Sequence, residues 1–153
     1  MTRHRIGYWR WLGNRDRFDP SDADLPDPHN LIDSSWNPDA KHLVIDYLKG
    51  GKAVVAFGGC STCRFKCGIP DNEMGSREFS DGLWCWPEGL AHYVEVHSVR
   101  LPTEFVDHIV KRNFQSRAHI VAAPRTDFDL SLWISWAWAQ CQPSNKPGEM
   151  RDT

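Results

Sequence analysis

Two cysteines and two histidines bracket one stretch of this chain and constrain its fold more than any other feature. The cysteines are Cys63 and Cys67, and the histidines are His92 and His97. Thiolate sulfur and imidazole nitrogen are the ligands that tetrahedral zinc prefers, and a structural site uses four of them. The pattern therefore predicts a structural zinc ion that joins the segment around the cysteines to the segment around the histidines.

The choice of cysteines stays open at this point. Cys60 with Cys63 forms a C-x2-C pair, whereas Cys63 with Cys67 forms a C-x3-C pair, so one of the three is surplus. Gly68 follows Cys67, as in a zinc knuckle whose backbone amides turn toward a thiolate. The histidines are five residues apart, which is a rotation of about 140° in an α-helix, so His97 reaches the ion only if the last helical turn loosens.

Composition indicates one globular domain. The 153 residues are 41% hydrophobic and 25% charged, which excludes a disordered chain. A net charge of -2 disfavours a nucleic-acid binder that works through overall charge. No secretory signal opens the chain and no run of about 18 apolar residues offers a membrane span. We therefore expect a cytoplasmic protein with no membrane partner, a zinc-stabilised domain over residues 1–141 and a flexible tail over 142–153.

The apolar patterning predicts four helices. The first covers residues 37–50. The second opens at Pro87 and carries both ligand histidines. The third covers residues 103–114, with His108 on its exposed face. The segment over residues 129–140 fits both helical and strand spacing, with the helix preferred.

The strands are expected to be few and short. Residues 52–57 read as a buried strand, and residues 76–86 as a hairpin with Asp81-Gly82 as its turn. Residues 118–123 form either a strand or a buried turn. The predicted fold class is α+β, with a small sheet and hairpin packed on three or four helices and one zinc-knuckle-plus-helix site.

Eight tryptophans are many for a chain of this length. Tryptophan builds cores, but it is also enriched at binding hot spots. A bulky core is the simpler expectation. The alternative is an interaction surface formed by Trp9, Trp11, Trp86, Tyr93 and Arg100.

The stretch CRFKCG, followed by MGSREFSDGLWCWPEGLAHYVEVHSVRLPTEFVDH, resembles a group of small uncharacterised bacterial proteins. Their pattern is approximately CR-x-x-CG, then DG-x-x-x-WPEGL-x-HYV-x-x-H-x-VRLP-x-x-F, and it covers roughly residues 60–110 of this chain. The resemblance implies a bacterial, cytoplasmic origin and supplies no mechanism. It implies one ligand set, which is Cys63, Cys67, His92 and His97. Cys60 and Cys85 fall outside that set.

The leading functional hypothesis is a non-catalytic, zinc-stabilised protein that binds a protein partner, as an adaptor, a regulator or a toxin-neutralising protein does. An alternative is a nucleic-acid-binding zinc module whose N-terminal arginines contact phosphates and whose nearby tryptophans stack on bases. The arginines are Arg3, Arg5, Arg10, Arg15 and Arg17.

A zinc-dependent hydrolase is the third hypothesis. A catalytic zinc keeps three protein ligands and one open position. Cys63, Cys67 and His92 would be the ligands if His97 were not one. Glu95 or Glu88 would then act as the general base.

Overall fold

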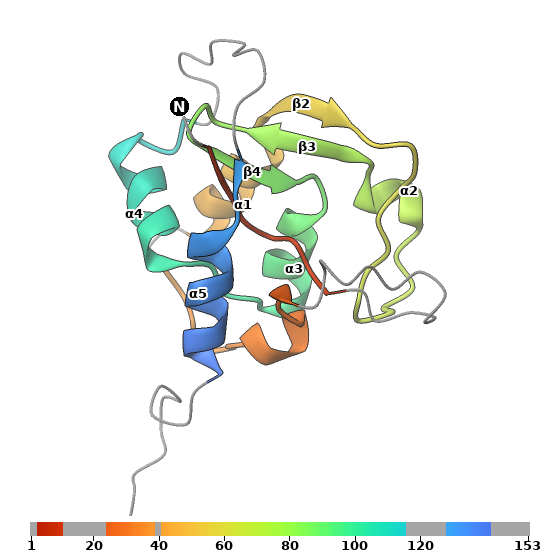
Figure 1. Cartoon of the computed structure of the whole chain (residues 1–153), viewed down its shortest axis with the longest axis horizontal. Coiled ribbons are helices and arrows are strands. Elements are labelled where there is room, and N and C mark those ends of the chain that lie inside the picture. The colour runs from red at the N-terminus through yellow and green to blue at the C-terminus, as the bar shows by residue number, and fades with distance from the viewer. Residues whose placement is uncertain (1–2, 11–23, 39–40, 116–127, 142–153) are drawn as a thin grey trace, which may run out of the picture.

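The computed structural model describes residues 3–10, 24–38, 41–115 and 128–141 (Figure 1). These residues form the predicted α+β fold, in which helices pack on one mixed β-sheet. The strands are β1 (Arg3–Arg5), β2 (Lys52–Ala56), β3 (Arg77–Ser80), β4 (Trp84–Pro87) and β5 (Phe128–Asp129). The helices are η3 (a 3-10 helix, Pro28–Leu31), α1 (Lys41–Lys49), α2 (Asp71–Met74), α3 (Leu90–His97), α4 (Thr103–Lys111) and α5 (Ser131–Gln140). The predictions for residues 118–123 and 142–153 lie outside the described residues.

The strands are hydrogen-bonded in the order β2-β3-β4-β1-β5. β2, β3 and β4 form an antiparallel meander, whereas β1 runs parallel to both of its neighbours, β4 and β5. His4 in β1 pairs with Trp84 on one side and with Asp129 on the other. α1 contacts α3 and α4, and α5 packs on β1 and η3 (Figure 1).

The predicted hairpin is confirmed as β3 and β4. Its turn lies at Asp81 and Gly82, as expected. The Oδ1 atom of Asp81 accepts the backbone N–H groups of Leu83 at 2.9 Å and Trp84 at 2.8 Å. Gly82 has a φ of +103°, a conformation that is costly for residues with a Cβ atom. The local Asp-Gly signal is therefore sufficient to place this turn.

The buried carboxylate of Asp81 also joins two helices to the hairpin. Its Oδ2 atom accepts the hydroxyl of Tyr47 from α1 and lies 2.8 Å from Nε2 of His108 in α4. The predicted surface position of His108 is therefore wrong, since its side chain is only 16% exposed. The reason is that α4 packs Phe105 against Trp84 of the hairpin, with ring centroids 5.0 Å apart.

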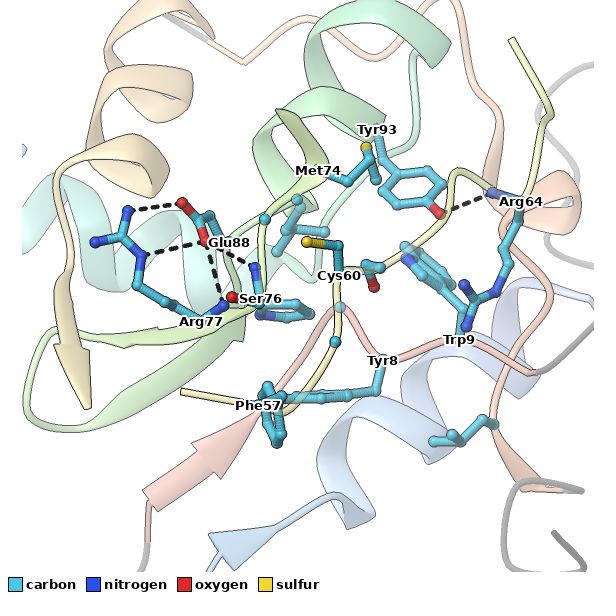
Figure 2. A pocket seen from close by; sticks show the side chains of 18 residues that line it. Tyr8, Trp9, Phe57, Cys60, Arg64, Met74, Ser76, Arg77, Glu88 and Tyr93 are labelled. Atoms are coloured by element: carbon cyan, nitrogen blue, oxygen red, sulfur yellow. Dashed lines mark hydrogen bonds and ion pairs between the residues drawn. The ribbon is translucent and has the colours of Figure 1, made fainter. Parts of the chain in front are cut away.

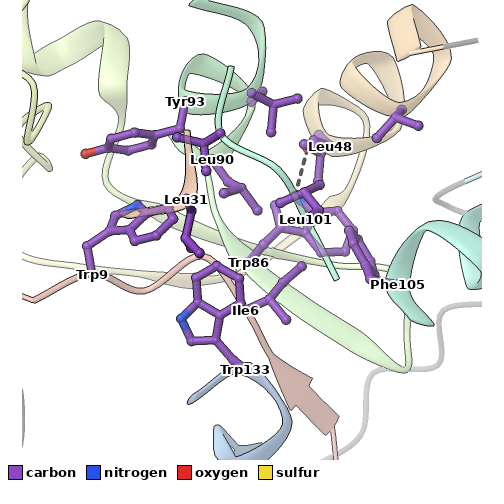
Figure 3. Packing of buried hydrophobic residues seen from close by; sticks show 14 of the residues in the cluster. Ile6, Trp9, Leu31, Leu48, Trp86, Leu90, Tyr93, Leu101, Phe105 and Trp133 are labelled. Atoms are coloured by element: carbon purple, nitrogen blue, oxygen red, sulfur yellow. Dashed lines mark hydrogen bonds between the residues drawn. The ribbon is translucent and has the colours of Figure 1, made fainter. Parts of the chain in front are cut away.

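Four of the eight tryptophans are buried in the core, as the simpler expectation predicted for them: Trp9, Trp84, Trp86 and Trp133. Trp86 and Trp133 are completely enclosed in one hydrophobic cluster that includes residues from all five α-helices (Figure 3). Each has a partner for its indole N–H: Trp86 donates to the carbonyl of Leu48 and Trp133 to the carbonyl of Tyr8, both at 2.9 Å. Buried indoles usually find such partners, because an unpaired N–H in the core is costly.

Two predictions about individual elements need correction. β2 is not buried: it is an edge strand whose residues Lys52 and Ala56 are exposed, because β3 is its only partner among the described strands. The helix with the histidines begins at Leu90 and not at Pro87. Pro87 is instead the last residue of β4 and pairs with Glu78.

The ambiguous segment near the end of the described chain is a short strand followed by a helix. β5 ends at Asp129, whose Oδ1 atom accepts the N–H of Ser131 at 2.8 Å at the start of α5. α5 buries Trp133 and Ala137 and leaves Trp138 47% exposed. Within the described ranges, every helix is too short or too polar to cross a lipid bilayer.

Candidate metal centre

The four predicted ligands lie together. Cys63, Cys67, His92 and His97 each offer one ligand atom, and these four atoms all lie within 4.8 Å of one another. Cys63 Sγ is 3.4 Å from His97 Nε2, and Cys67 Sγ is 3.4 Å from His92 Nε2. The two Nε2 atoms are 3.2 Å apart. The chain thus forms a Cys2His2 group that can hold a metal ion.

The three shortest printed separations between ligand atoms fit one tetrahedral ion. Bonds of about 2.3 Å to sulfur and about 2.0–2.1 Å to nitrogen place two nitrogens about 3.3 Å apart, and a nitrogen and a sulfur about 3.6 Å apart. The observed separations of 3.2 and 3.4 Å agree with these values to about 0.2 Å. In a binuclear iron–sulfur centre that has two histidine ligands, both histidines bind one iron and both cysteines bind the other iron. Contact of each thiol with an imidazole therefore indicates a mononuclear site.

The cysteines lie on a tight loop before α2. The N–H of Lys66 donates to the carbonyl of Cys63 at 3.0 Å and closes a turn. Lys66 and Gly68 have φ values of +51° and +88°. The backbone amides of Phe65 and Cys67 donate to the Cys63 sulfur. This is the arrangement predicted for a knuckle, in which amides stabilise negative charge on a thiolate.

The end of α3 brings the two histidines together. Ser98 adopts a left-handed conformation with a φ of +55°, and its N–H donates to the carbonyl of Tyr93, five residues earlier. This bond widens the last turn relative to an α-helix, whose bonds span four residues. His92 and His97 then reach the same point despite their five-residue spacing, as the sequence required.

Two aromatic residues hold the cysteine loop against α3. The hydroxyl of Tyr93 accepts the N–H of Arg64 at 2.9 Å and lies 3.4 Å from the carbonyl of Thr62. The ring of Phe65 stacks on His97, with centroids 4.2 Å apart and an interplanar angle of 22°. Such neighbours orient metal ligands. Neither role was predicted, and the only sequence signal is that Phe65 lies between the two ligand cysteines.

Burial shifts the titration of the ligands. It lowers the pKa of His92 and of His97, which favours the neutral imidazole that a metal requires. It also raises the pKa of Cys63, to which the adjacent Cys67 thiol contributes. A divalent cation would favour the thiolate, so metal binding should release protons.

The other cysteines stand apart from the group. No disulfide joins any of the five cysteines. Cys60 is exposed, and Cys85 is enclosed in β4, where burial raises the pKa of its thiol. The ligand group contains Cys63 and Cys67, so the C-x3-C alternative is the one that the fold assembles.

The two candidate general bases are engaged in ion pairs. Glu88 accepts from the guanidinium of Arg77 at 2.7 Å and from the backbone of Ser76 at 3.1 Å. The hydrogen bond from Arg77 lowers the pKa of Glu88, which weakens it as a base. Glu95 pairs with Lys49 at 2.8 Å. Neither glutamate belongs to the ligand group.

Most of the described residues proposed for an interaction surface are buried or paired. Arg100 pairs with Asp33 at 3.3 Å and is half-buried. Trp11 lies outside the described residues. The other three are buried in the core because they pack the helices on the sheet: Trp9, Trp86 and Tyr93.

The N-terminal arginines that the structure describes also pack against the rest of the fold. Arg3 is 5% exposed, and Nε of Arg5 lies 3.0 Å from a carboxylate oxygen of the enclosed Glu78. Arg10 is half-buried. Arg15 and Arg17 lie outside the described residues. The described arginines therefore form no exposed row that would follow a phosphate backbone.

No family model, curated protein or solved structure matches this chain. The resemblance to small bacterial proteins therefore stays a prediction. What the chain does has to be inferred from the site and from the surfaces around it.

Proposed function

We propose that this chain is a non-catalytic protein whose fold is stabilised by a structural zinc ion and which acts by binding a protein partner. The observation that carries the non-catalytic part is the convergence of four ligand atoms within 4.8 Å. Four protein ligands fill a tetrahedral shell, so no position is left for a water nucleophile or a substrate. The ion pairs of Glu88 and Glu95 support the same conclusion.

Zinc is the ion that the donor set favours. Two thiolates and two imidazoles in a tetrahedron suit zinc better than the oxygen-seeking ions magnesium and calcium. Thiolate ligands must stay reduced to bind metal, and a reducing compartment keeps them so. A cytoplasmic setting is therefore part of the proposal.

The exposed edge of the sheet at β2 supports the proposal that the chain binds a protein partner. β2 is an edge strand, and Lys52, Ala53 and Ala56 on it are exposed. Phe57, which follows the strand, is 46% exposed. An extended segment of a partner can add to such an edge through main-chain hydrogen bonds, with side-chain contacts giving specificity.

The metal is tested on protein purified without added zinc. Elemental analysis should find one zinc per chain, and X-ray absorption should find two sulfur and two nitrogen neighbours. Cys63→Ser should lose the metal, whereas Cys60→Ser, in the same loop but outside the ligand group, should retain it. Three protein ligands with one light oxygen would contradict the structural site and restore the hydrolase hypothesis.

The partner is tested by photo-crosslinking in cells that express the chain. A benzophenone amino acid in place of Ala53 on β2 should form one discrete adduct with another protein. The same amino acid in place of Val110, which is 50% exposed on α4, is the matched control and should not form it. An identical adduct from both positions, or none from position 53, would contradict binding at this edge.

A further inference from the structure

A pocket of about 310 Å³ lies beside the metal centre. Its walls come from the segment after β1, the loop between β2 and the cysteines, the α2–β3 junction and the start of α3 (Figure 2). This volume is at the lower end of the range for small-molecule sites. It is not part of the ligand group, although Tyr93 and Arg64 belong to both surroundings.

Aromatic side chains form much of the wall. Tyr8, Trp9, Phe57 and Tyr93 all line the space. Trp9 is held in place from two sides, with its ring 5.2 Å from that of Tyr93 and 5.2 Å from that of Trp133. A wall fixed in this way can accept a flat ligand without first becoming ordered, which removes one cost of binding.

Trp9 carries a buried donor with no acceptor. Its side chain is 7% exposed, and its Nε1 atom has no hydrogen-bond partner among the described residues. Two other enclosed indoles, those of Trp86 and Trp133, donate to carbonyls. Figure 2 shows the indole nitrogen of Trp9 turned toward the space beside Cys60. A buried N–H without an acceptor is costly, so a ligand oxygen at this place would relieve that cost.

Two glycines shape the cavity. Gly7 has a φ of +78°, and a Cβ atom there would lie 2.8 Å from the side chain of Leu90. Gly75 has a φ of +84°, and a Cβ atom there would lie 2.1 Å from the carboxylate of Glu88. Backbone conformations of this kind are favourable only for glycine. The walls therefore depend on close backbone approaches at two separate points.

We propose that this pocket binds a flat aromatic small molecule that carries a carboxylate or carbonyl oxygen. The aromatic ring packs between the side chains of Tyr8, Trp9 and Tyr93. The oxygen accepts a hydrogen bond from Nε1 of Trp9. This site is distinct from the ligand group and from β2, although the loop that carries the ligand cysteines forms part of its wall.

The test is a titration of the full chain, labelled with nitrogen-15, followed through its tryptophan indole N–H signals by NMR. The signal of Trp9 is the one that disappears in Trp9→Phe. The probes are 2-naphthoate, 2-naphthamide and, as a non-planar match, cyclohexanecarboxylate. The two naphthalene probes should shift the Trp9 signal downfield and saturate, because a new hydrogen bond deshields the proton, whereas cyclohexanecarboxylate should not.

Two variants separate the contribution of the hydrogen bond to affinity from nonspecific hydrophobic binding. Trp9→Phe keeps an aromatic ring but removes the donor, and it should weaken binding of 2-naphthoate by about tenfold. Trp138→Phe removes a partly exposed indole outside the pocket and should leave binding unchanged. If Trp9→Phe does not fold, Cys60→Phe fills the pocket from an exposed position and should abolish binding.

Several results would overturn the proposal. They are equal affinity of Trp9→Phe and the parent chain, equal affinity for the planar and non-planar acids, retained binding in Cys60→Phe, and no binding of any probe at millimolar concentration. Each of these outcomes leaves the zinc and crosslinking experiments untouched, since those measure metal content and adducts with a protein partner and not binding of the probes.

Discussion

The buried carboxylate of Asp81 links the β3–β4 hairpin to helices α1 and α4. Burial disfavours its ionised form, but hydrogen bonds from His108, Tyr47 and the hairpin amides outweigh burial and lower the pKa of Asp81. A carboxyl group whose pKa is lower in the folded than in the unfolded chain stabilises the fold at neutral pH. That contribution is lost as the pH falls through the folded pKa.

Asp81→Asn is therefore expected to lower the free energy of unfolding at pH 7 by about 2–4 kcal/mol. The difference from the parent chain should begin to shrink as the pH falls below about 4, where the carboxyl group of the unfolded parent chain becomes protonated, and should shrink further as the pH falls through the lower folded pKa of Asp81. Urea unfolding of both proteins across this pH range measures the difference in the free energy of unfolding. Subtracting one value from the other removes the pH-dependent contributions that both proteins share. Asp46→Asn, at an exposed position of α1, is the control. A difference that is constant with pH would contradict this account.

Tyr93 is the residue through which the helix supports the metal loop. Tyr93→Phe removes the acceptor of the Arg64 N–H and should lower stability by about 1 kcal/mol. It should also weaken zinc binding several-fold, because residues that orient ligands affect metal affinity. Competition with a chromophoric chelator measures this affinity. Tyr47→Phe, which disturbs Asp81 instead, should cost stability but leave zinc affinity unchanged. Equal losses of affinity in both variants would exclude a role specific to Tyr93.

At the scale of elements, the junction between α2 and β3 depends on one glycine. Gly75 has a φ of +84°, and the Glu88 carboxylate fills the space where its Cβ atom would be. That carboxylate accepts the backbone N–H groups of Ser76 and Arg77 at the start of β3.

Gly75→Ala should lower the free energy of unfolding by more than about 1 kcal/mol, because it combines backbone strain with displacement of Glu88. Gly58→Ala is the matched control, since no atom lies within 4 Å of a Cβ atom there and its φ is not positive. Thermal unfolding followed by circular dichroism compares the two. Similar melting temperatures for both variants would show that Glu88 moves aside without cost.

Elements that depend on local signals were predictable from the sequence, and elements that depend on distant pairing were not. The hairpin turn follows from Asp81-Gly82, and a cysteine–histidine metal site follows from residue types and spacing. The choice of Cys63 and Cys67 over Cys60 does not follow from spacing and comes only from the resemblance. The edge position of β2 could not be read from its apolar residues, because burial depends on which strands lie beside it. The pairing of β1 with β4 and β5, and the contact of His108 with Asp81, join residues that no local pattern connects.

For the whole molecule, a metal held by the ligand group would join the loop between β2 and α2 to α3. In the described structure, few other contacts hold that loop to α3, notably those of Tyr93 and Phe65. A chelator is therefore expected to lower the melting temperature and to expose the backbone amides of residues 64–69 to hydrogen exchange. Amides in α4 and α5, which pack on the other elements, should keep more of their protection. An unchanged melting temperature after complete metal removal would contradict a structural ion.

The place of β1 inside the sheet has a consequence for biosynthesis. A ribosome makes β1 before either of its neighbours, β4 and β5, and those neighbours pair with it in parallel. Such distant contacts form slowly, since a long loop has to close first. The nascent chain therefore carries an unpaired strand through most of its synthesis, in a state that chaperones recognise and that is prone to aggregate. A folded carrier protein fused ahead of β1 would keep the nascent chain soluble until β4 and β5 are synthesised. A carrier fused after α5 would be synthesised only after β1 has already been exposed.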